Sequence, residues 1–202
     1  MKNLGILLFP NFELLDVCGP AEMFGVVPEH FKLVTVAQQR GLVASTQGIE
    51  VMAQYSTEDC PALDILMVPG GMGTRTEVDN RTLLSWLAER SAQVQLILSV
   101  CTGALLLAKA GLLDNRNATS NKRAWELTAI HGPDVRWVTE ARWVDDGNLV
   151  TSSGVSAGID MALHVIERYA GEAVAEKVAN RTEYKWNRDP NWDPFAMING
   201  LT

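Results

Sequence analysis

Cys101 is the residue whose type and setting point most directly to chemistry. It follows the apolar run at residues 94–100 and precedes a second apolar stretch that opens with Thr102-Gly103-Ala104. A strand that turns at once into a helix forces its junction residue into a tight, exposed elbow. The free N–H groups of the helix N-terminus favour thiolate over thiol. The pattern therefore predicts a nucleophilic cysteine of lowered pKa; a structural cysteine is the alternative, preferred here for Cys18 and Cys60.

Asp16 is the candidate carboxyl partner of that thiol. It follows the first apolar run, residues 4–9. A carboxyl beside a thiolate shares a proton with it and then serves as acid or base. Two adjacent anions are unfavourable, so the pKa of Asp16 is expected above its usual range. Its position fits equally an N-cap for a helix opened by Pro20, and that alternative stays open.

A glycine-rich loop supplies the candidate substrate-binding residues Gly70, Gly71 and Met72. The loop, Pro69-Gly70-Gly71-Met72-Gly73, follows the apolar run at residues 64–68. Glycines allow backbone N–H groups to face a ligand, here as an anion-stabilising pair. A Gly-Gly pair alone usually only turns the chain, so the prediction depends on the position of the loop after a strand.

The three histidines give no sign of a metal or cofactor site. His30, His131 and His164 lie far from Cys101 in the sequence, and no Cys/His cluster has the spacing of a zinc site. Phosphate-loop and dinucleotide-binding fingerprints are absent from the sequence. We therefore expect no cofactor and no metal.

The elements that position these residues alternate between strand and helix. The predicted strands cover 4–9, 31–37, 64–68 and 94–100, with an antiparallel excursion at 43–53 and a hairpin at 135–151. The predicted helices cover 19–24, 79–90 with Asp79 as N-cap, 102–110, 157–169 and 172–182. Such alternation predicts an α/β fold, a doubly wound and mostly parallel sheet flanked by helices. Ligands of these sheets gather at the carboxyl ends of the strands, where Asp16, Gly70 and Cys101 all fall.

Composition narrows the class of protein. The 202 residues fit one domain over 1–202, and 47% hydrophobic residues suffice for a core. The net charge of −7, without a basic cluster, speaks against binding to nucleic acid or to an anionic membrane surface. Polar residues interrupt the most apolar stretch, 96–113, so it is not a membrane span. No signal peptide is evident and the three cysteines are an odd number, so a reducing cytoplasm is expected.

Several motifs together resemble the ThiJ/PfpI superfamily, which is related to the class I glutamine amidotransferases. In chain order they are GILLFP, LD..GP, D.LMVPGG, SVCTGALLLAKAGLL, ATS and TSSGVSAGIDMALHVIE. The resemblance runs from about residue 4 to about residue 168. Cys-Thr-Gly at the elbow and an aspartate in the first loop are most similar to the isocyanide hydratases. The same variant occurs in the amino-terminal domains of some AraC-type transcription regulators.

The resemblance implies a role for each matching residue. Cys101 is the implied nucleophile, Asp16 its carboxyl partner, Thr102 a residue that lines the site, and Gly70 with Gly71 backbone donors. The implied reaction adds water to an isocyanide through a thioimidate on Cys101 and releases an N-substituted formamide, with no cofactor. Family members usually pair, and this together with apolar residues around Val17, Met23 and Phe24 predicts a homodimer.

Departures from the family pattern leave rival functions open. Protease-type members carry Cys-His at the elbow, and many hydratase-like members carry a histidine where this chain has Asn121, so proteolysis is not expected. The rivals are a glyoxalase or deglycase that acts on reactive aldehydes, and a non-catalytic redox sensor that works through Cys101. DNA-binding regulation is discounted, because it needs a helix-turn-helix region beyond this fold and the chain is acidic. The tail with Trp186 and Trp192 matches no recognisable pattern.

Overall fold

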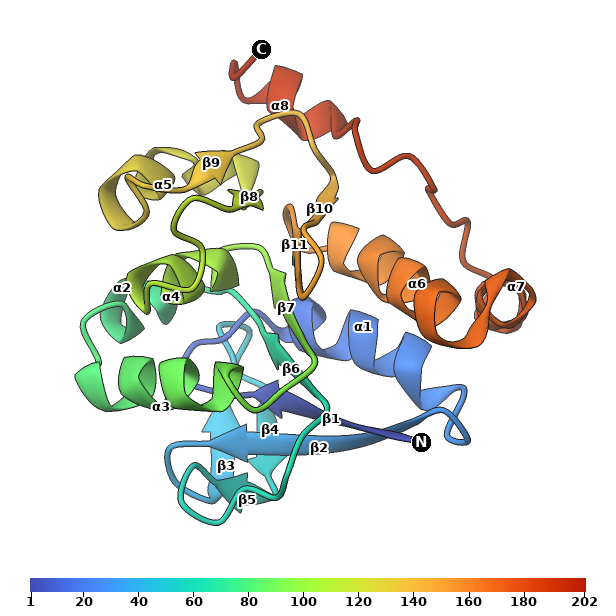
Figure 1. Ribbon diagram of the computed structural model, residues 1–202, viewed down its shortest axis with the longest axis horizontal. Helices are drawn as coiled ribbons and strands as arrows, with labels where there is room; N and C mark the ends of the chain where they lie inside the picture. Colours follow the sequence, from blue (N-terminus) through green and yellow to red (C-terminus); the bar gives the residue numbers. More distant parts are fainter.

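The computed structural model describes residues 1–202 and places a seven-stranded sheet at the centre of the molecule (Figure 1). The strand order is β10-β11-β7-β6-β1-β2-β5, and every pair is parallel except β10–β11. The strands are β1 (Lys2–Leu7), β2 (Phe31–Ala37), β5 (Tyr55–Ser56), β6 (Ile65–Val68), β7 (Leu96–Val100), β10 (Trp143–Asp145) and β11 (Leu149–Ser152). All residues of β6 and β7 are buried, as continuous apolar runs predict for strands covered on both faces.

Helices cover both faces of this sheet (Figure 1). One layer consists of α1 (Leu14–Gly25), α6 (Ala157–Ala170) and α7 (Glu172–Arg181), and the other of α2 (Thr74–Glu77), α3 (Arg81–Ser91) and α4 (Gly103–Lys109). A single cluster of buried hydrophobic side chains runs through both layers. The predicted doubly wound, mostly parallel α/β fold is confirmed, and the clustering agrees with one domain.

Smaller elements complete the chain. They are the antiparallel hairpin β3 (Gly41–Ala44) and β4 (Glu50–Ala53), the parallel pair β8 (Asn117–Ala118) and β9 (Arg136–Trp137), the 3₁₀-helix η1 (Lys122–Ala124), α5 (Glu126–His131) and α8 (Pro194–Ile198). The predicted excursion at 43–53 is this first hairpin. The predicted hairpin at 135–151 is confirmed only for β10 and β11, because β9 pairs with β8 instead.

Two predicted helix starts are wrong. Helix α1 begins at Leu14, so Pro20 lies inside it rather than at its first turn. Pro20 is itself buried, and this packing offsets the backbone hydrogen bond that a proline inside a helix removes. Asp79 is not the N-cap of α3, because Asn80 takes that place and accepts a hydrogen bond from the Leu83 N–H at 3.2 Å.

The apolar residues that were predicted to form a dimer surface lie inside the molecule. Val17, Met23 and Phe24 are all buried, since α1 packs against α6 and β2. That reason for a homodimer is therefore wrong, and the homodimer stays a prediction that rests on the resemblance alone.

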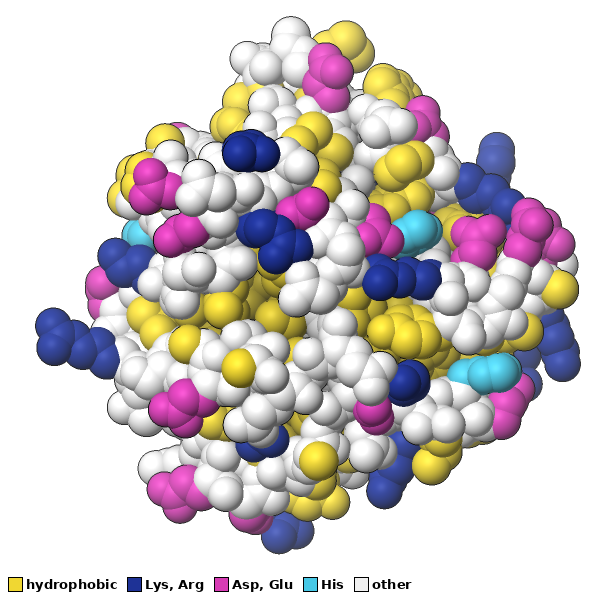
Figure 2. Space-filling model, in the orientation of Figure 1, with side chains coloured by type: hydrophobic (Ala, Val, Ile, Leu, Met, Phe, Trp, Pro, Cys, Tyr) yellow, Lys and Arg dark blue, Asp and Glu magenta, His cyan; other side chains and the backbone are white.

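The surface mixes charges of both signs. Figure 2 shows basic and acidic side chains interspersed over one face, with no large basic cluster there. None of the helices combines the length and the apolar character that crossing a membrane requires.

Candidate active site

Cys101 occupies a strained elbow between β7 and α4. Its φ of 58° lies in the left-handed region, which residues other than glycine rarely adopt. The Cys101 N–H donates to the Ser153 carbonyl at 2.8 Å, so the turn is fastened to the end of β11. A Cβ on Gly103 would lie 2.2 Å from the Val68 carbonyl oxygen, so only glycine lets α4 start this close to β6. The predicted elbow is confirmed.

The thiol differs from the prediction in its burial and its acidity. Only 6% of Cys101 is exposed, so the residue is not the exposed group that the elbow pattern predicts. Burial, and then the Asp16 carboxylate, raise the pKa of the Cys101 thiol to about 12. Hydrogen bonds from the backbone N–H groups of Thr102 and Val155 lower the pKa but do not reverse the shift. The predicted lowering of the pKa is wrong because the loss of hydration outweighs the helix N-terminus.

Asp16 is fully buried in the first turn of α1. Its Oδ2 accepts a hydrogen bond from the Gly70 N–H at 2.8 Å. Oδ1 has no hydrogen-bond partner, and Cys101 is the one side chain that lowers the pKa of the carboxyl. The N-cap of α1 is Glu13, so the alternative role of Asp16 as an N-cap is wrong.

The acidity of Asp16 follows from that burial. Burial raises the pKa of Asp16 from 3.8 to about 7, while the Gly70 hydrogen bond opposes the shift and the charge of Glu13 adds to it. The predicted direction is confirmed, but its main cause is lost hydration rather than a neighbouring thiolate. A carboxyl with this pKa is suited to accept and return a proton near neutral pH.

The glycine loop supports the site in a different way from the one predicted. The Gly70 N–H is taken by Asp16 and the Gly71 N–H donates to Thr102 Oγ1 at 3.1 Å, so neither is free for a ligand. The prediction of an anion-stabilising N–H pair is wrong for this state of the protein. Gly71 has a φ of 122°, and a Cβ there would lie 2.4 Å from the Glu13 nitrogen, so this position of the loop requires glycine.

Thr102 connects the elbow to the glycine loop. Besides accepting the Gly71 hydrogen bond, its buried Oγ1 lies 3.1 Å from Thr74 Oγ1. The Thr102 side chain also lowers the pKa of the Cys101 thiol. Thr102 thus holds the loop in register with the nucleophile.

A Thr102→Val substitution tests this support. Valine has nearly the same shape but leaves the buried Gly71 N–H without an acceptor, which costs about 1–3 kcal/mol of unfolding free energy. Denaturant unfolding of Thr102→Val and Thr102→Ser measures the effect. The serine variant keeps the hydroxyl and is expected to unfold close to wild type, whereas equal losses in both variants would contradict the hydrogen-bonding role.

A cavity of about 280 Å³ opens beside the nucleophile. Of the predicted site residues, Cys101, Thr102, Gly71 and Met72 line it, and Met72 is 58% exposed at its rim. Gly70 and Asp16 do not line the cavity. The structure therefore brings the predicted residues to one place, but it puts Asp16 behind the thiol.

Six residues that were not among the predicted site residues also line this cavity: Glu13, Arg75, Asn121, Arg123, Ala124 and Val155. Arg75 and Arg123 bring positive charge, and Val155 has a strained φ of 34°. Asn121 Oδ1 accepts hydrogen bonds from the Arg123 and Ala124 N–H groups and so caps η1. The sequence had marked Asn121 only as a departure from the family pattern. Val155 also had a visible signal, since Ser-Gly-Val-Ser follows a strand at the same edge of the sheet.

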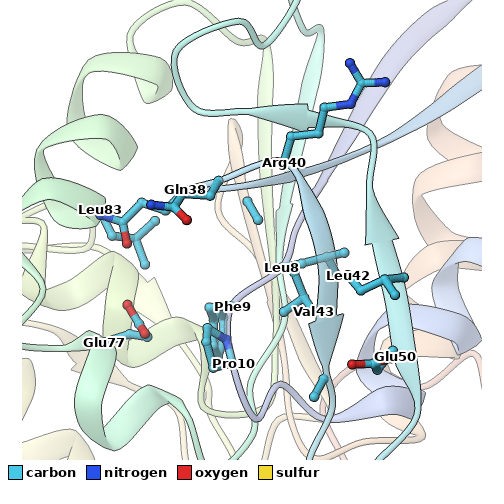
Figure 3. Close-up of a pocket in the computed structure, with 13 residues that line it drawn as sticks. Leu8, Phe9, Pro10, Gln38, Arg40, Leu42, Val43, Glu50, Glu77 and Leu83 are labelled. Atoms are coloured by element: carbon cyan, nitrogen blue, oxygen red, sulfur yellow. The ribbon is translucent and has the colours of Figure 1, made fainter.

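A larger cavity lies elsewhere. It measures about 480 Å³ and lies between the β3–β4 hairpin and α3, with Leu8, Phe9 and Pro10 in its wall and Glu77 facing them (Figure 3). Its lining contains no cysteine, serine, threonine, lysine or histidine. Size therefore does not locate the chemistry, and the smaller cavity with the elbow does. No group of three or more Cys, His, Asp and Glu side chains is arranged to hold a metal ion.

The fold and the elbow define a doubly wound α/β protein with a cysteine at the carboxyl edge of its sheet. The DJ-1/PfpI family model matches residues 2–168, and the chain belongs to this family. The resemblance to the ThiJ/PfpI superfamily is thereby confirmed.

Relatives in the family differ in function. The chain is 34% identical over 182 residues to an isonitrile hydratase of Pseudomonas putida, covering 90% of this chain and 78% of the relative. It is 29% identical to the HTH-type transcriptional regulator GbdR of Pseudomonas aeruginosa, of which the match covers only 51%. A ThiJ/PfpI family protein from Pseudomonas syringae has a similar structure, with a TM-score of 0.85 and 32% identity over 92% of this chain and 76% of the other.

Proposed function

We propose that the protein is a cysteine-dependent hydratase that converts a small isocyanide and water into an N-substituted formamide. The observation that carries the proposal is the buried pair of Cys101 and Asp16 beside a cavity of about 280 Å³. The 34% identity to an isonitrile hydratase adds support. The substrate is a small molecule, the reaction needs no added cofactor, and we place the protein in the cytoplasm as a homodimer.

The first half of the reaction forms a thioimidate. Asp16 accepts the Cys101 proton while Sγ attacks the terminal carbon of R–N≡C, and the proton then passes from Asp16 to that carbon. The product of this half is R–N=CH–S–Cys101. Once Asp16 has taken the proton, it is neutral and no longer repels the developing thiolate. The pKa of the Cys101 thiol therefore falls toward that of Asp16 as the proton moves. The Thr102 and Val155 N–H groups hydrogen-bond the sulfur as its charge develops.

The second half hydrolyses the thioimidate. Asp16 removes a proton from a water molecule as the water oxygen bonds to the former isocyanide carbon, and it passes that proton to the nitrogen, which gives R–NH–CH(OH)–S–Cys101. Asp16 then takes the hydroxyl proton and delivers it to the Cys101 sulfur as the C–S bond breaks, and the formamide R–NH–CHO leaves. The sum is one isocyanide and one water consumed for each formamide. Both halves need a carboxyl that loads and unloads a proton near neutral pH, which a pKa of about 7 permits.

The site disfavours two other functions. A redox sensor needs an accessible cysteine of low pKa, whereas Cys101 is buried and its pKa is raised. A protease needs an acid for the amine leaving group, and no histidine lines the cavity. The Asn121 amide oxygen is already occupied by backbone N–H groups. A glyoxalase or deglycase would attack an aldehyde with the same thiol and carboxyl. An activity assay is therefore needed to distinguish that function from the proposed one.

A substrate panel tests the proposal. Purified protein is assayed with phenyl and cyclohexyl isocyanide for formamide formation, and with methylglyoxal for aldehyde loss. We expect formamide from wild type and from Cys18→Ala, and none from Cys101→Ala. Turnover of methylglyoxal without turnover of either isocyanide would contradict the proposal and indicate a glyoxalase or deglycase. No turnover of either class, together with reversible oxidation of Cys101, would favour the sensor.

A further inference from the structure

The C-terminal segment, residues 184–198, completes a wall beside the candidate active site. It lies outside residues 2–168, which the family model matches. Figure 1 shows it running from the end of α7 to α8, at the top of the view. Helix α8 packs against η1, the short helix that Asn121 caps next to the Cys101 cavity.

A buried aspartate fastens the first part of the segment. Asp160, on α6, accepts hydrogen bonds from the Tyr184 hydroxyl at 3.1 Å and from the Asn187 N–H at 2.9 Å. Its other oxygen lies 2.6 Å from Arg142 Nη2 in a buried ion pair. The ion pair holds the Asp160 carboxylate in place, and the two hydrogen bonds from Tyr184 and Asn187 attach the segment to it.

A second buried aspartate connects the segment to the nucleophile. The Asp193 N–H donates to the Glu140 carbonyl at 2.7 Å, and its Oδ1 accepts from the Phe195 N–H at 3.2 Å at the start of α8. Asp193 Oδ2 accepts a hydrogen bond from the Ser153 hydroxyl. The Ser153 carbonyl in turn accepts from the Cys101 N–H at 2.8 Å. Phe195 is thereby held in a fixed relation to the elbow.

Phe195 lines a cavity of about 150 Å³ that adjoins the one beside Cys101. The two cavities share Asn121, Arg123 and Val155 in their linings. Phe195 and Val155 supply the hydrophobic side chains of the smaller cavity, and Phe195 is 48% exposed. A ligand that reaches from Sγ past Val155 therefore meets an aromatic ring that still has surface to bury.

We infer that Phe195 determines specificity by receiving the N-substituent of the substrate while the reacting carbon lies at Cys101. The inference rests on the proposed function. Aryl and cycloalkyl groups extend further from the reacting carbon than methyl and ethyl groups do, and they have more apolar surface to bury against the ring. The segment thus selects for bulky apolar isocyanides without touching the reacting atoms.

Substrate selectivity of Phe195→Ala tests the inference. For phenyl isocyanide, kcat/KM is expected to fall about tenfold, the usual range for losing one apolar contact in a pocket, while ethyl isocyanide changes little. The conservative variant Phe195→Tyr keeps the ring and is expected to keep the selectivity. The matched control is Met197→Ala, on the same helix, 68% exposed and lining neither cavity. Equal losses for both substrates, or the same change in the control, would overturn the inference.

Alkylation of Cys101 gives a readout that does not depend on turnover. In this reaction an S–C bond forms, the C–I bond breaks, iodide leaves, and the thiol proton passes through Asp16 to solvent. Wild type is expected to react faster with N-phenyliodoacetamide than with iodoacetamide, and Phe195→Ala to lose this preference about threefold to tenfold. Rates are followed at each cysteine by mass spectrometry. If the hydratase assay fails but Phe195→Ala still loses the preference for N-phenyliodoacetamide, only the proposed function is refuted. If Phe195→Ala keeps the wild-type preference, the role of Phe195 is refuted.

Discussion

Replacing Cys101 by serine is expected to lower isocyanide turnover at least about 10⁴-fold, as loss of a nucleophile does in other covalent enzymes. Serine keeps the shape of the elbow, and its hydroxyl still reaches the Asp16 carboxyl. An alcohol, however, is far less acidic than a thiol, and Asp16 has a pKa of only about 7. The carboxylate therefore cannot generate an alkoxide, and the first bond to the isocyanide carbon does not form.

The control for this variant is Cys60→Ser. Cys60 is partly buried and lines none of the cavities described above, so its replacement is expected to leave turnover unchanged. Initial rates of formamide formation for the two variants are compared at equal protein concentration, with circular dichroism to show that both are folded. A Cys101→Ser protein that retains more than a tenth of the wild-type rate would contradict a nucleophilic role for the thiol.

The elbow was predictable from the sequence because it is a local feature. An apolar strand followed without a linker by an apolar helix with Gly103 near its start leaves Cys101 no other backbone path. The convergence of Asp16 and Gly70 on the same place was predictable as well, because parallel strands present their carboxyl ends at one edge. Both inferences need only the order of the elements, which the apolar runs reveal.

The surroundings of the thiol were not predictable in the same way. Burial and the charge of Asp16 raise the pKa of the thiol, whereas the N–H groups of Thr102 and Val155 lower it. Asp16 and Val155 reach the thiol from parts of the chain that are distant in the sequence. The two glycine N–H groups were expected to face a ligand, and only the fold shows that side chains of the site already use them. Phe195 belongs to no sequence motif. Its place beside the cavity results from anchors at Asp160 and Asp193, which are 33 residues apart in the sequence and follow no regular pattern.

The Asp16→Asn variant is expected to lose turnover about 10³-fold and to gain stability at neutral pH. Asparagine still accepts the Gly70 hydrogen bond through its amide oxygen, so the loop is held as before. It cannot take the Cys101 proton or deliver one to carbon, and general acid–base catalysis contributes about 10²–10⁴-fold at such a position. The gain in stability arises because asparagine, unlike Asp16, neither has to take up a proton on folding nor has to bury a charge.

The sign of the pH dependence follows from the raised pKa of Asp16. The folded protein holds the proton up to about pH 7, whereas an ordinary aspartate loses it near 3.8. Between these values the unfolded chain binds fewer protons, so the stability is full below about pH 4 and declines as the pH rises to 7. The total is about 4 kcal/mol at most. Asp16→Asn is expected to lack this decline, while Asp114→Asn, at an exposed carboxyl, keeps it.

Alkylation of Cys101 by iodoacetamide shows whether the same carboxyl controls the thiol. In wild type the rate is expected to rise with a midpoint near pH 7, because the ionised Asp16 accepts the thiol proton and the pair titrates as a unit. In Asp16→Asn the buried thiol has no such base, so the midpoint should move above about 9 and the rate at pH 7 should fall about 100-fold. Cys18 and Cys60 serve as internal references in the same mass spectra. If the midpoint at Cys101 is the same in both proteins, Asp16 is not the base, and the mechanism proposed for the pair is wrong.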